Sequence, residues 1–140
     1  FMGYQNRPGI FKVGGVEVAA NWSLKNWNIS TNYTFTEKVD QAPLRLPKHA
    51  ANLGLNYAAP KTQWGLHWRY IGSRYDVNQA FAQEKLDAYA LVDVRIAFPS
   101  FIGNTTASLA VTNIFDVEYS EIFGFTTLGR NLNIALRYAF

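Results

Sequence analysis

Apolar and polar residues alternate one by one along much of this chain, most regularly over residues 131–140. One face of that segment carries Leu132, Ile134, Leu136, Tyr138 and Phe140. The opposite face carries Asn131, Asn133, Ala135, Arg137 and Ala139. A period of two predicts a β-strand, because successive side chains of a strand point to opposite faces. Since the apolar face is wide and rich in aromatic residues, we expect it to contact lipid in an outer-membrane β-barrel.

The same alternation predicts seven strands in all, at residues 13–24, 27–36, 49–57, 63–75, 88–98, 105–115 and 131–140. These lengths suit a tilted strand that crosses the hydrocarbon layer, which needs about 9–11 residues. The expected fold class is therefore all-β, a transmembrane, antiparallel, up-and-down barrel.

The connections between these strands alternate in length, which constrains the topology independently. Short connections are predicted at residues 25–26, 58–62 and 99–104, and long ones at 37–48, 76–87 and 116–130. Such barrels have short periplasmic turns and long extracellular loops. A periplasmic C-terminus then puts every short turn inside and every long loop outside. Within the second long loop, residues 76–86 are compatible with a short helix capped by Asp76.

Aromatic residues gather at the ends of the predicted strands. The periplasmic ends hold Trp22, Trp27, Tyr57, Trp64, Phe98, Tyr138 and Phe140. The outer ends hold Tyr33, Phe35, Tyr70, Tyr75 and Tyr89. Two aromatic girdles are typical of a membrane barrel, whereas a soluble β-sandwich has no reason to sort its aromatic residues to strand ends.

Composition narrows the possible functions. The net charge of +3 is small, and Lys and Arg are scattered, which argues against a nucleic-acid partner. No apolar run is long enough for a transmembrane helix, and the absence of Cys excludes disulfides and Cys-ligated metals. His49 and His67 are too far apart on the predicted strands to share a metal, and no Ser has a plausible base partner. We therefore expect no enzyme, no cofactor and no metal site.

An odd number of strands suggests that the barrel is larger than this chain. Bacterial single-chain barrels have even numbers of strands, so that both termini reach the periplasm. Residues 1–12 would instead start outside the cell. We expect residues 1–140 to be the C-terminal portion of a larger barrel, with earlier strands absent.

Several motifs carry a family resemblance. The segment Asn113-Ile114-Phe115-Asp116-Val117-Glu118-Tyr119, followed by Gly124 and by Gly129-Arg130, resembles the C-terminal region of TonB-dependent outer-membrane receptors. The stretches at residues 46–57 and 70–75 are similar to the same family. The resemblance implies a plugged barrel of about 22 strands, of which these are the last seven, in the outer membrane of a Gram-negative bacterium.

The resemblance also implies a function and its partners. It implies TonB-driven import of a scarce, bulky nutrient such as a siderophore–iron complex, a cobalamin or a haem. The partners would be outer-membrane lipid, the receptor's own plug domain and, through a missing N-terminal part, the TonB complex. Two other classes remain open: a passive porin or structural barrel without TonB coupling, and a soluble β-sandwich binding module.

Candidate site residues fall into two groups. The face that would line the lumen carries Glu17, His67, Arg69, Asp93, Arg95 and Arg137. These side chains could contact the plug or the substrate path, or simply line a wet interior. If Trp64 and Phe98 are level, Arg69 lies opposite Asp93 as a cross-strand ion pair.

The long loops hold the candidate ligand-binding residues Arg74, Tyr75, Tyr119, Phe123, Phe125 and Arg130. Aromatic and Arg side chains suit ligand capture, but they could equally pack the loops against themselves.

The last strand also resembles an assembly signal. Asn133, Ala135, Tyr138 and Phe140 approximate the pattern that the barrel-assembly machinery reads, with Ala135 in place of the usual Gly. The physical basis would be strand addition, in which an exposed edge offers backbone hydrogen bonds and alternate side chains give specificity.

Overall fold

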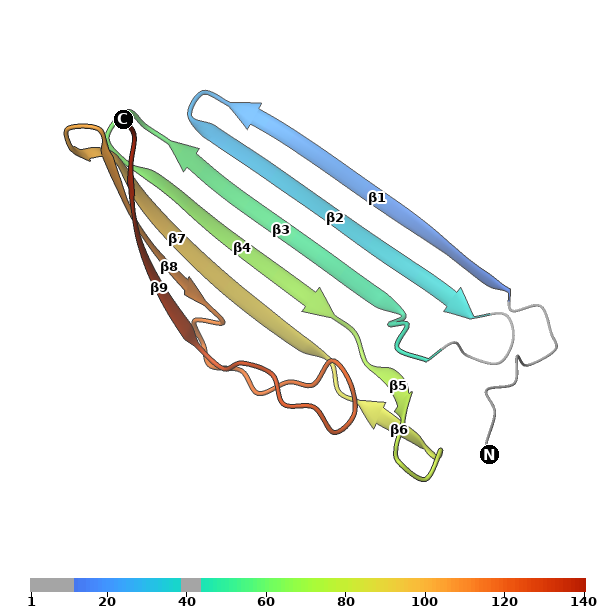
Figure 1. The fold of residues 1–140 in the computed structure, drawn as a ribbon. Helices are drawn as coiled ribbons and strands as arrows, with labels where there is room; N and C mark the ends of the chain where they lie inside the picture. Colours follow the sequence, from blue (N-terminus) through green and yellow to red (C-terminus); the bar gives the residue numbers. More distant parts are fainter. Residues whose placement is uncertain (1–11, 39–43) are drawn as a thin grey trace.

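The computed structural model describes residues 12–38 and 44–140, and their main element is one curved antiparallel sheet (Figure 1). Its seven strands are β1 (Val13–Leu24), β2 (Trp27–Lys38), β3 (His49–Ala58), β4 (Gln63–Ile71), β7 (Tyr89–Ile102), β8 (Thr105–Thr112) and β9 (Asn131–Tyr138). The strand order β1-β2-β3-β4-β7-β8-β9 follows the chain, as in an up-and-down barrel. The predicted all-β class and its seven long strands are confirmed.

A hairpin of two short strands stands apart from this sheet, between β4 and β7 (Figure 1). It consists of β5 (Arg74–Val77) and β6 (Gln83–Leu86). The predicted helix at residues 76–86 is therefore wrong. The Asn78 side chain accepts hydrogen bonds from the backbone N–H groups of Ala80 and Ala82, at 2.9 and 3.0 Å, and so holds a tight turn rather than a helix.

Among the strand ends that differ from the expected bounds, three have a local reason. β4 ends at Ile71, where the Gly72 backbone N–H donates to the His49 carbonyl. The two backbones are so close there that a Cβ atom on residue 72 would lie 2.9 Å from that carbonyl oxygen. β7 continues past Pro99 to Ile102 through a bulge in which Ser100 has a φ of 54°. β8 ends at Thr112 because Asn113 turns the chain with a φ of 50°.

The register sorts side chains to two faces of the long sheet. We call the polar face the one that carries Asn52, His67 and Asp93, and the apolar face the one that carries Trp27, Tyr57 and Trp64. The rings of Trp27 and Tyr57 lie 4.9 Å apart and those of Tyr57 and Trp64 lie 6.1 Å apart. These three aromatic residues form a row near the end of the sheet that has the short turns.

The expected ion pair between Arg69 and Asp93 does not form. Asp93 lies opposite His67, with 4.0 Å between Asp93 Oδ2 and His67 Nδ1, and Arg69 lies opposite Leu91. The cause is a register shifted by two residues, which pairs Trp64 with Ile96 instead of Phe98. Because β7 runs on to Ile102, Phe98 is not at its end.

The last long connection, residues 113–130, folds over the polar face at the long-loop end of β7. Tyr89 and Leu91 lie on the same face as Asp93, and both are buried. The Asn113 backbone N–H donates to Asp93 Oδ1 at 2.8 Å. This end of the molecule therefore contains most of the buried apolar side chains of the described residues.

The described residues contain no helix long and apolar enough to cross a membrane. The predicted extracellular start at residues 1–12 falls, except for Lys12, outside the described residues, as do residues 39–43 of the first long loop.

Candidate functional site: the long-loop cluster

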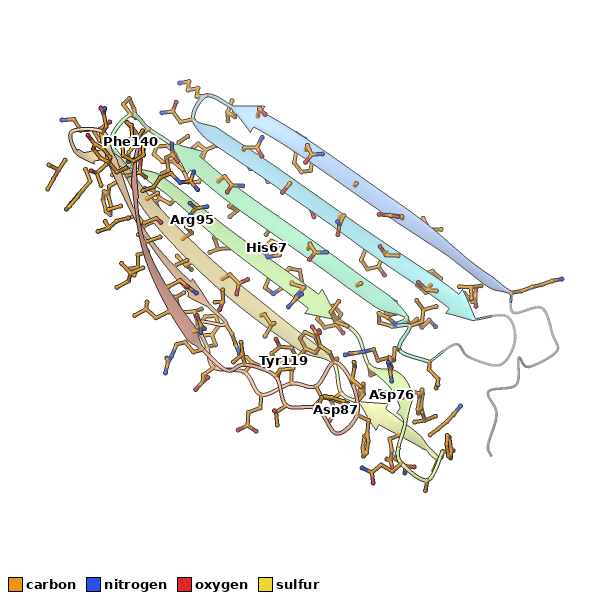
Figure 2. The ribbon with its side chains drawn as sticks, viewed as in Figure 1. His67, Asp76, Asp87, Arg95, Tyr119 and Phe140 are labelled. Atoms are coloured by element: carbon orange, nitrogen blue, oxygen red, sulfur yellow. The ribbon has the colours of Figure 1, made fainter. Side chains whose placement is uncertain are left out.

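Three long connections meet at one end of the sheet, opposite the short turns and Phe140 (Figure 2). We call this assembly the loop cluster and define it as Arg45, the β5–β6 hairpin and residues 113–130. Figure 2 shows Asp76, Asp87 and Tyr119 together at this end. Its parts come from distant sequence positions, so its geometry depends on contacts between loops.

Asp76 joins all three parts. Its side chain is fully buried, with 0% of its surface exposed. Asp76 Oδ1 accepts hydrogen bonds from Arg45 Nε and the Val77 backbone N–H, both at 2.9 Å. Asp76 Oδ2 accepts one from the Phe123 backbone N–H at 2.8 Å. The carboxylate of Asp76 therefore fixes the position of the last loop relative to the hairpin.

The electrostatics of Asp76 agree with this structural role. The Phe123 N–H bond lowers the pKa of Asp76, and the Arg45 and Val77 bonds lower it further, against the opposing effect of burial. A carboxylate that accepts several N–H bonds is stabilised in its charged form. Asp76 is therefore an ionised anchor rather than a proton donor or acceptor.

Arg74 forms a second connection between the hairpin and the last loop. Only 5% of its surface is exposed, and Nη2 donates to the carbonyls of Ser120 and Glu121 at 2.8 and 3.2 Å. The guanidinium also lies over the Tyr89 ring, 5.5 Å from its centroid. Nη1 is buried without a hydrogen-bond partner among the described residues. The structure thus places Arg74, a predicted ligand-binding residue, inside the loop cluster.

The motif around Asn113 has a structural explanation. Asn113 and Asp116 have φ values of 50° and 55°, a left-handed conformation that Asn and Asp tolerate better than most residues. The Asn113 side chain exchanges two hydrogen bonds with the Val117 backbone, both at 2.9 Å. Asp116 Oδ1 accepts the Arg130 backbone N–H at 2.7 Å and lies where a side chain on residue 129 would be, which explains Gly129.

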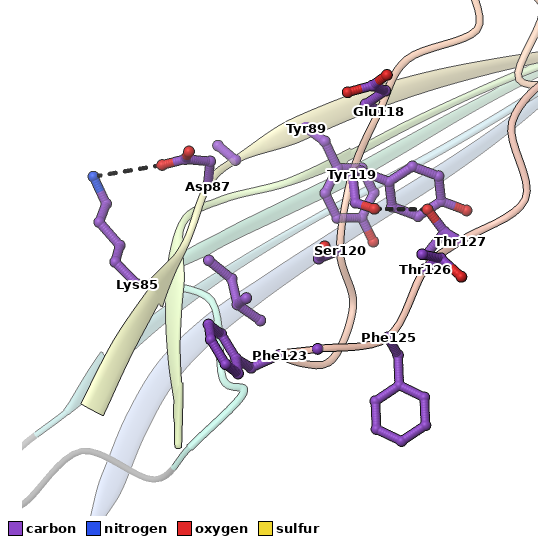
Figure 3. Close-up of a pocket in the computed structure, with 13 residues that line it drawn as sticks. Lys85, Asp87, Tyr89, Glu118, Tyr119, Ser120, Phe123, Phe125, Thr126 and Thr127 are labelled. Carbon is purple, nitrogen blue, oxygen red and sulfur yellow. Dashed lines mark hydrogen bonds and ion pairs between the residues drawn. The ribbon is translucent and has the colours of Figure 1, made fainter. Parts of the chain in front are cut away.

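A pocket of about 740 Å³ opens between the base of the hairpin and the last loop (Figure 3). Its lining is Lys85, Leu86, Asp87, Ala88, Tyr89, Glu118, Tyr119, Ser120, Phe123, Gly124, Phe125, Thr126 and Thr127. The Tyr89 and Tyr119 rings lie 4.5 Å apart, and Thr127 Oγ1 donates to the Tyr119 carbonyl at 2.6 Å. A pocket of this volume is large enough for a small molecule, and its aromatic rings lie beside several polar groups.

The predicted ligand-binding residues other than Arg74 separate into two environments. Tyr119, Phe123 and Phe125 line the pocket; Phe123 is 39% exposed and Phe125 is 68% exposed, with its ring directed away from the two tyrosines (Figure 3). Tyr75 and Arg130 are exposed but do not line the pocket. The sequence reasoning missed the charged lining residues Lys85, Asp87 and Glu118, since no local pattern brings them together.

The predicted lumen residues lie on the polar face, but only part of them come together. His67, Asp93 and Arg95 line a shallow hollow of about 280 Å³. Figure 2 shows His67 midway along the sheet. Glu17 on β1, Arg69 on β4 and Arg137 on β9 lie on the same face outside that hollow.

The predicted assembly residues follow β9 to the chain end. Asn133 Nδ2 donates to Asn131 Oδ1 at 2.7 Å, and Ala135 lies opposite Ser108. The Tyr138 and Phe140 rings meet edge to face at 5.4 Å. β9 is the edge strand of the described sheet, and among the described residues no strand pairs with its outer edge.

Comparison with known proteins identifies the family. Residues 2–114 match the family model described as TonB dependent receptor-like, beta-barrel. The chain belongs to this family. TonB-dependent receptors are transport receptors, not enzymes, and their location is the outer membrane of Gram-negative bacteria.

Solved structures of TonB-dependent receptors share the fold. The siderophore receptor PiuA from Acinetobacter baumannii superposes with a TM-score of 0.76 at 20% identity, over 91% of this chain and 22% of PiuA. The pyoverdine outer-membrane receptor FpvA from Pseudomonas aeruginosa PAO1, bound to pyoverdine, gives 0.72 at 23% identity over 93% and 22%. The copper transporter OprC gives 0.69 at 22% identity over 91% and 23%. The chain thus spans less than a quarter of the length of each of these receptors.

Proposed function

We propose that this chain is the C-terminal portion of a TonB-dependent receptor that imports a scarce, bulky nutrient by TonB-coupled active transport. The barrel would have about 22 strands, the number of plugged outer-membrane transporters. The sheet described here would form its last seven strands, and the plug domain and the TonB-contacting segment would belong to other parts of the receptor.

The observation that carries this proposal is the loop cluster over the polar face. Asp76 and Arg74 hold two long loops in one arrangement, so that the aromatic pocket exists before a ligand arrives. Loops fixed in advance lose less conformational entropy on binding, which favours affinity. A passive pore needs no such site at its mouth.

The ligand class follows from the pocket and from the relatives. The walls offer aromatic rings together with Lys85, Asp87 and Glu118, which suit a large molecule with both apolar and polar groups. PiuA is a siderophore receptor and FpvA is bound to pyoverdine. We therefore place a siderophore–iron complex first among the candidates, before a cobalamin or a haem.

The decisive experiment measures uptake by the complete receptor in cells with and without TonB. A panel of iron-loaded siderophores, cobalamin and haem is supplied at limiting concentration. Uptake that requires TonB supports the proposal, and uptake that persists without TonB identifies a passive pore instead.

A substitution then tests whether the pocket is the ligand site. Phe125→Ala removes an exposed pocket ring, and we expect weaker binding of the transported compound with normal surface levels. Phe101→Ala is the matched control, because Phe101 is also exposed but lies on β7 near the short turn at residues 103–104. Equal affinities in the two variants would place the ligand elsewhere.

A further inference from the structure

A group of aromatic and basic side chains lies at the long-loop end of the apolar face. We call it the rim cluster and define it as Tyr33, Phe35, Lys48, His49 and Tyr70. The Tyr33 hydroxyl and His49 Nδ1 are 2.7 Å apart, and their rings stack at 27°. The His49 ring lies 5.4 Å from that of Phe35, and Lys48 Nζ lies 5.5 Å from the Phe35 centroid. Two basic groups are thus held against the same aromatic ring.

The register places the aromatic members and His49 on the face that contacts lipid, and Lys48, which precedes β3, is brought to that face by its contact with the Phe35 ring. Phe35 pairs with His49, and Tyr33 pairs with Ala51, which in turn pairs with Tyr70. These positions share the face of Trp27 and Tyr57, whereas the loop cluster covers the opposite, polar face. The rim cluster is therefore separate from the proposed nutrient site.

The length of β2 places the rim cluster at the level of the lipid headgroups. Trp27 and Phe35 are eight residues apart on this strand, or about 26 Å along it. A tilt of about 40° reduces that to a height of about 20 Å, close to the apolar band of about 25 Å in such barrels. With the Trp27 row at the periplasmic boundary, Phe35 and His49 lie at the outer boundary.

The aromatic rings are explained by an interfacial girdle, but the basic groups are not. A Lys side chain on the lipid face is costly in hydrocarbon and favourable beside an anionic headgroup. The hydrogen bond of His49 Nδ1 to Tyr33 turns the ring so that Nε2 remains for an outside group. We propose that the rim cluster binds a phosphate group of an outer-leaflet lipid, through Lys48 Nζ and His49 Nε2.

The surrounding charges define where the phosphate binds. On the same face, Glu37 lies two residues beyond Phe35 on β2 and would repel an anion. The neighbour level with Phe35 on β1 is Val16, and the cluster member on β4 is Tyr70; both are neutral. The phosphate therefore binds on the β3 side of Phe35, away from Glu37.

The experiment uses native mass spectrometry of the complete receptor in detergent, with bisphosphorylated lipid A as the probe and fully dephosphorylated lipid A as its counterpart. Lys48→Ala and His49→Gln should each reduce retention of the phosphorylated lipid by about fivefold, the contribution of one basic residue beside an anionic lipid surface. Glu37→Gln should increase retention, and Lys48→Arg should preserve it. Lys61→Ala is the charge-matched control at the short-turn end and should have no effect.

Three results would overturn the proposal. One is equal retention of phosphorylated and dephosphorylated lipid A by the wild-type receptor. Another is unchanged retention in both Lys48→Ala and His49→Gln, or unchanged retention in Glu37→Gln, whose expected effect has the opposite sign and cannot come from misfolding. The third is displacement of the lipid by millimolar inorganic phosphate, which would show a general anion site instead.

Discussion

Asp76→Asn should loosen the last long loop without unfolding the sheet. Three donors reach the two carboxylate oxygens of Asp76: Arg45 Nε and the backbone N–H groups of Val77 and Phe123. A carboxamide has one oxygen, so at least one donor must face an NH₂ group. Since Asp76 is completely buried, water cannot replace the lost acceptor.

The magnitude follows from these contacts. A buried donor left unsatisfied costs about 1–3 kcal/mol, and bonds to charged groups lie in the upper part of that range. Because Arg45 is half exposed, its charge adds little beyond the hydrogen bond. We therefore expect a local loss of about 2–3 kcal/mol, which corresponds to a roughly 30- to 150-fold larger open population of the loop.

Hydrogen exchange followed by mass spectrometry of the complete receptor measures this opening directly. Peptides that contain Phe123 should exchange about 30- to 150-fold faster in Asp76→Asn, while peptides from β2 and β3 should not change. Asp87→Asn is the matched control, because Asp87 is 92% exposed and lies 3.9 Å from Lys85 in a surface pair. Wild-type exchange at Phe123 in Asp76→Asn would refute the anchoring role of this carboxylate.

The pH dependence has a definite sign. The pKa of Asp76 is lowered in the folded protein, so its stabilising effect is fully present above the ordinary Asp value of about 3.9 and is lost as the pH falls through the lowered pKa. Wild-type loops should therefore still resist pepsin at about pH 4 and become susceptible only in stronger acid. Asp76→Asn should be cut within residues 113–130 already at about pH 4. Identical digestion profiles would contradict this reasoning.

Three further predictions concern the membrane-spanning sheet. Val94→Arg, on the apolar face, should destabilise the barrel by up to about 2–4 kcal/mol, whereas Arg95→Ala on the polar face should cost much less; denaturant titration of the complete receptor checks the order. A cysteine at Gln79 should react with an impermeant reagent on intact cells and one at Lys61 should not; the reverse would invert the topology. Phe140→Ala should lower the surface level of folded receptor while leaving its ligand affinity unchanged, since Phe140 lies at the opposite end from the loops; normal surface levels would argue against an assembly signal.

Strand positions could be predicted from the sequence because their cause is local. A sheet with lipid on one face and a polar interior on the other requires alternation, and β1 shows it from Val16 to Leu24. Register has a different origin. Between β4 and β7 it depends on how far β7 runs, and no alternation reveals that this strand continues past Pro99 to Ile102. The incorrect pairing of Arg69 with Asp93 is the direct result.

The loop cluster could be predicted only in part, because its contacts join distant residues. The sequence predicts Asp76 as the cap of a short helix, but its partners Arg45 and Phe123 are 31 and 47 positions away. The residues of the Asn113 motif could be recognised as a family feature. The structure explains why these residues occur: Asn113 and Asp116 adopt left-handed conformations, and Gly129 leaves room for the Asp116 side chain. Together they define the path of the loop.

Phe123 shows how the loop cluster could keep its architecture while its ligand changes. Its backbone N–H donates to Asp76, whereas its side chain lines the pocket. The anchor therefore does not depend on the identity of residue 123, and Arg74 likewise binds backbone carbonyls of Ser120 and Glu121. If the pocket binds the ligand as proposed, substitutions on the pocket side would alter selectivity without releasing the loop. In Phe123, the backbone N–H thus fixes the loop, while the side chain is free to set the chemistry of the pocket wall.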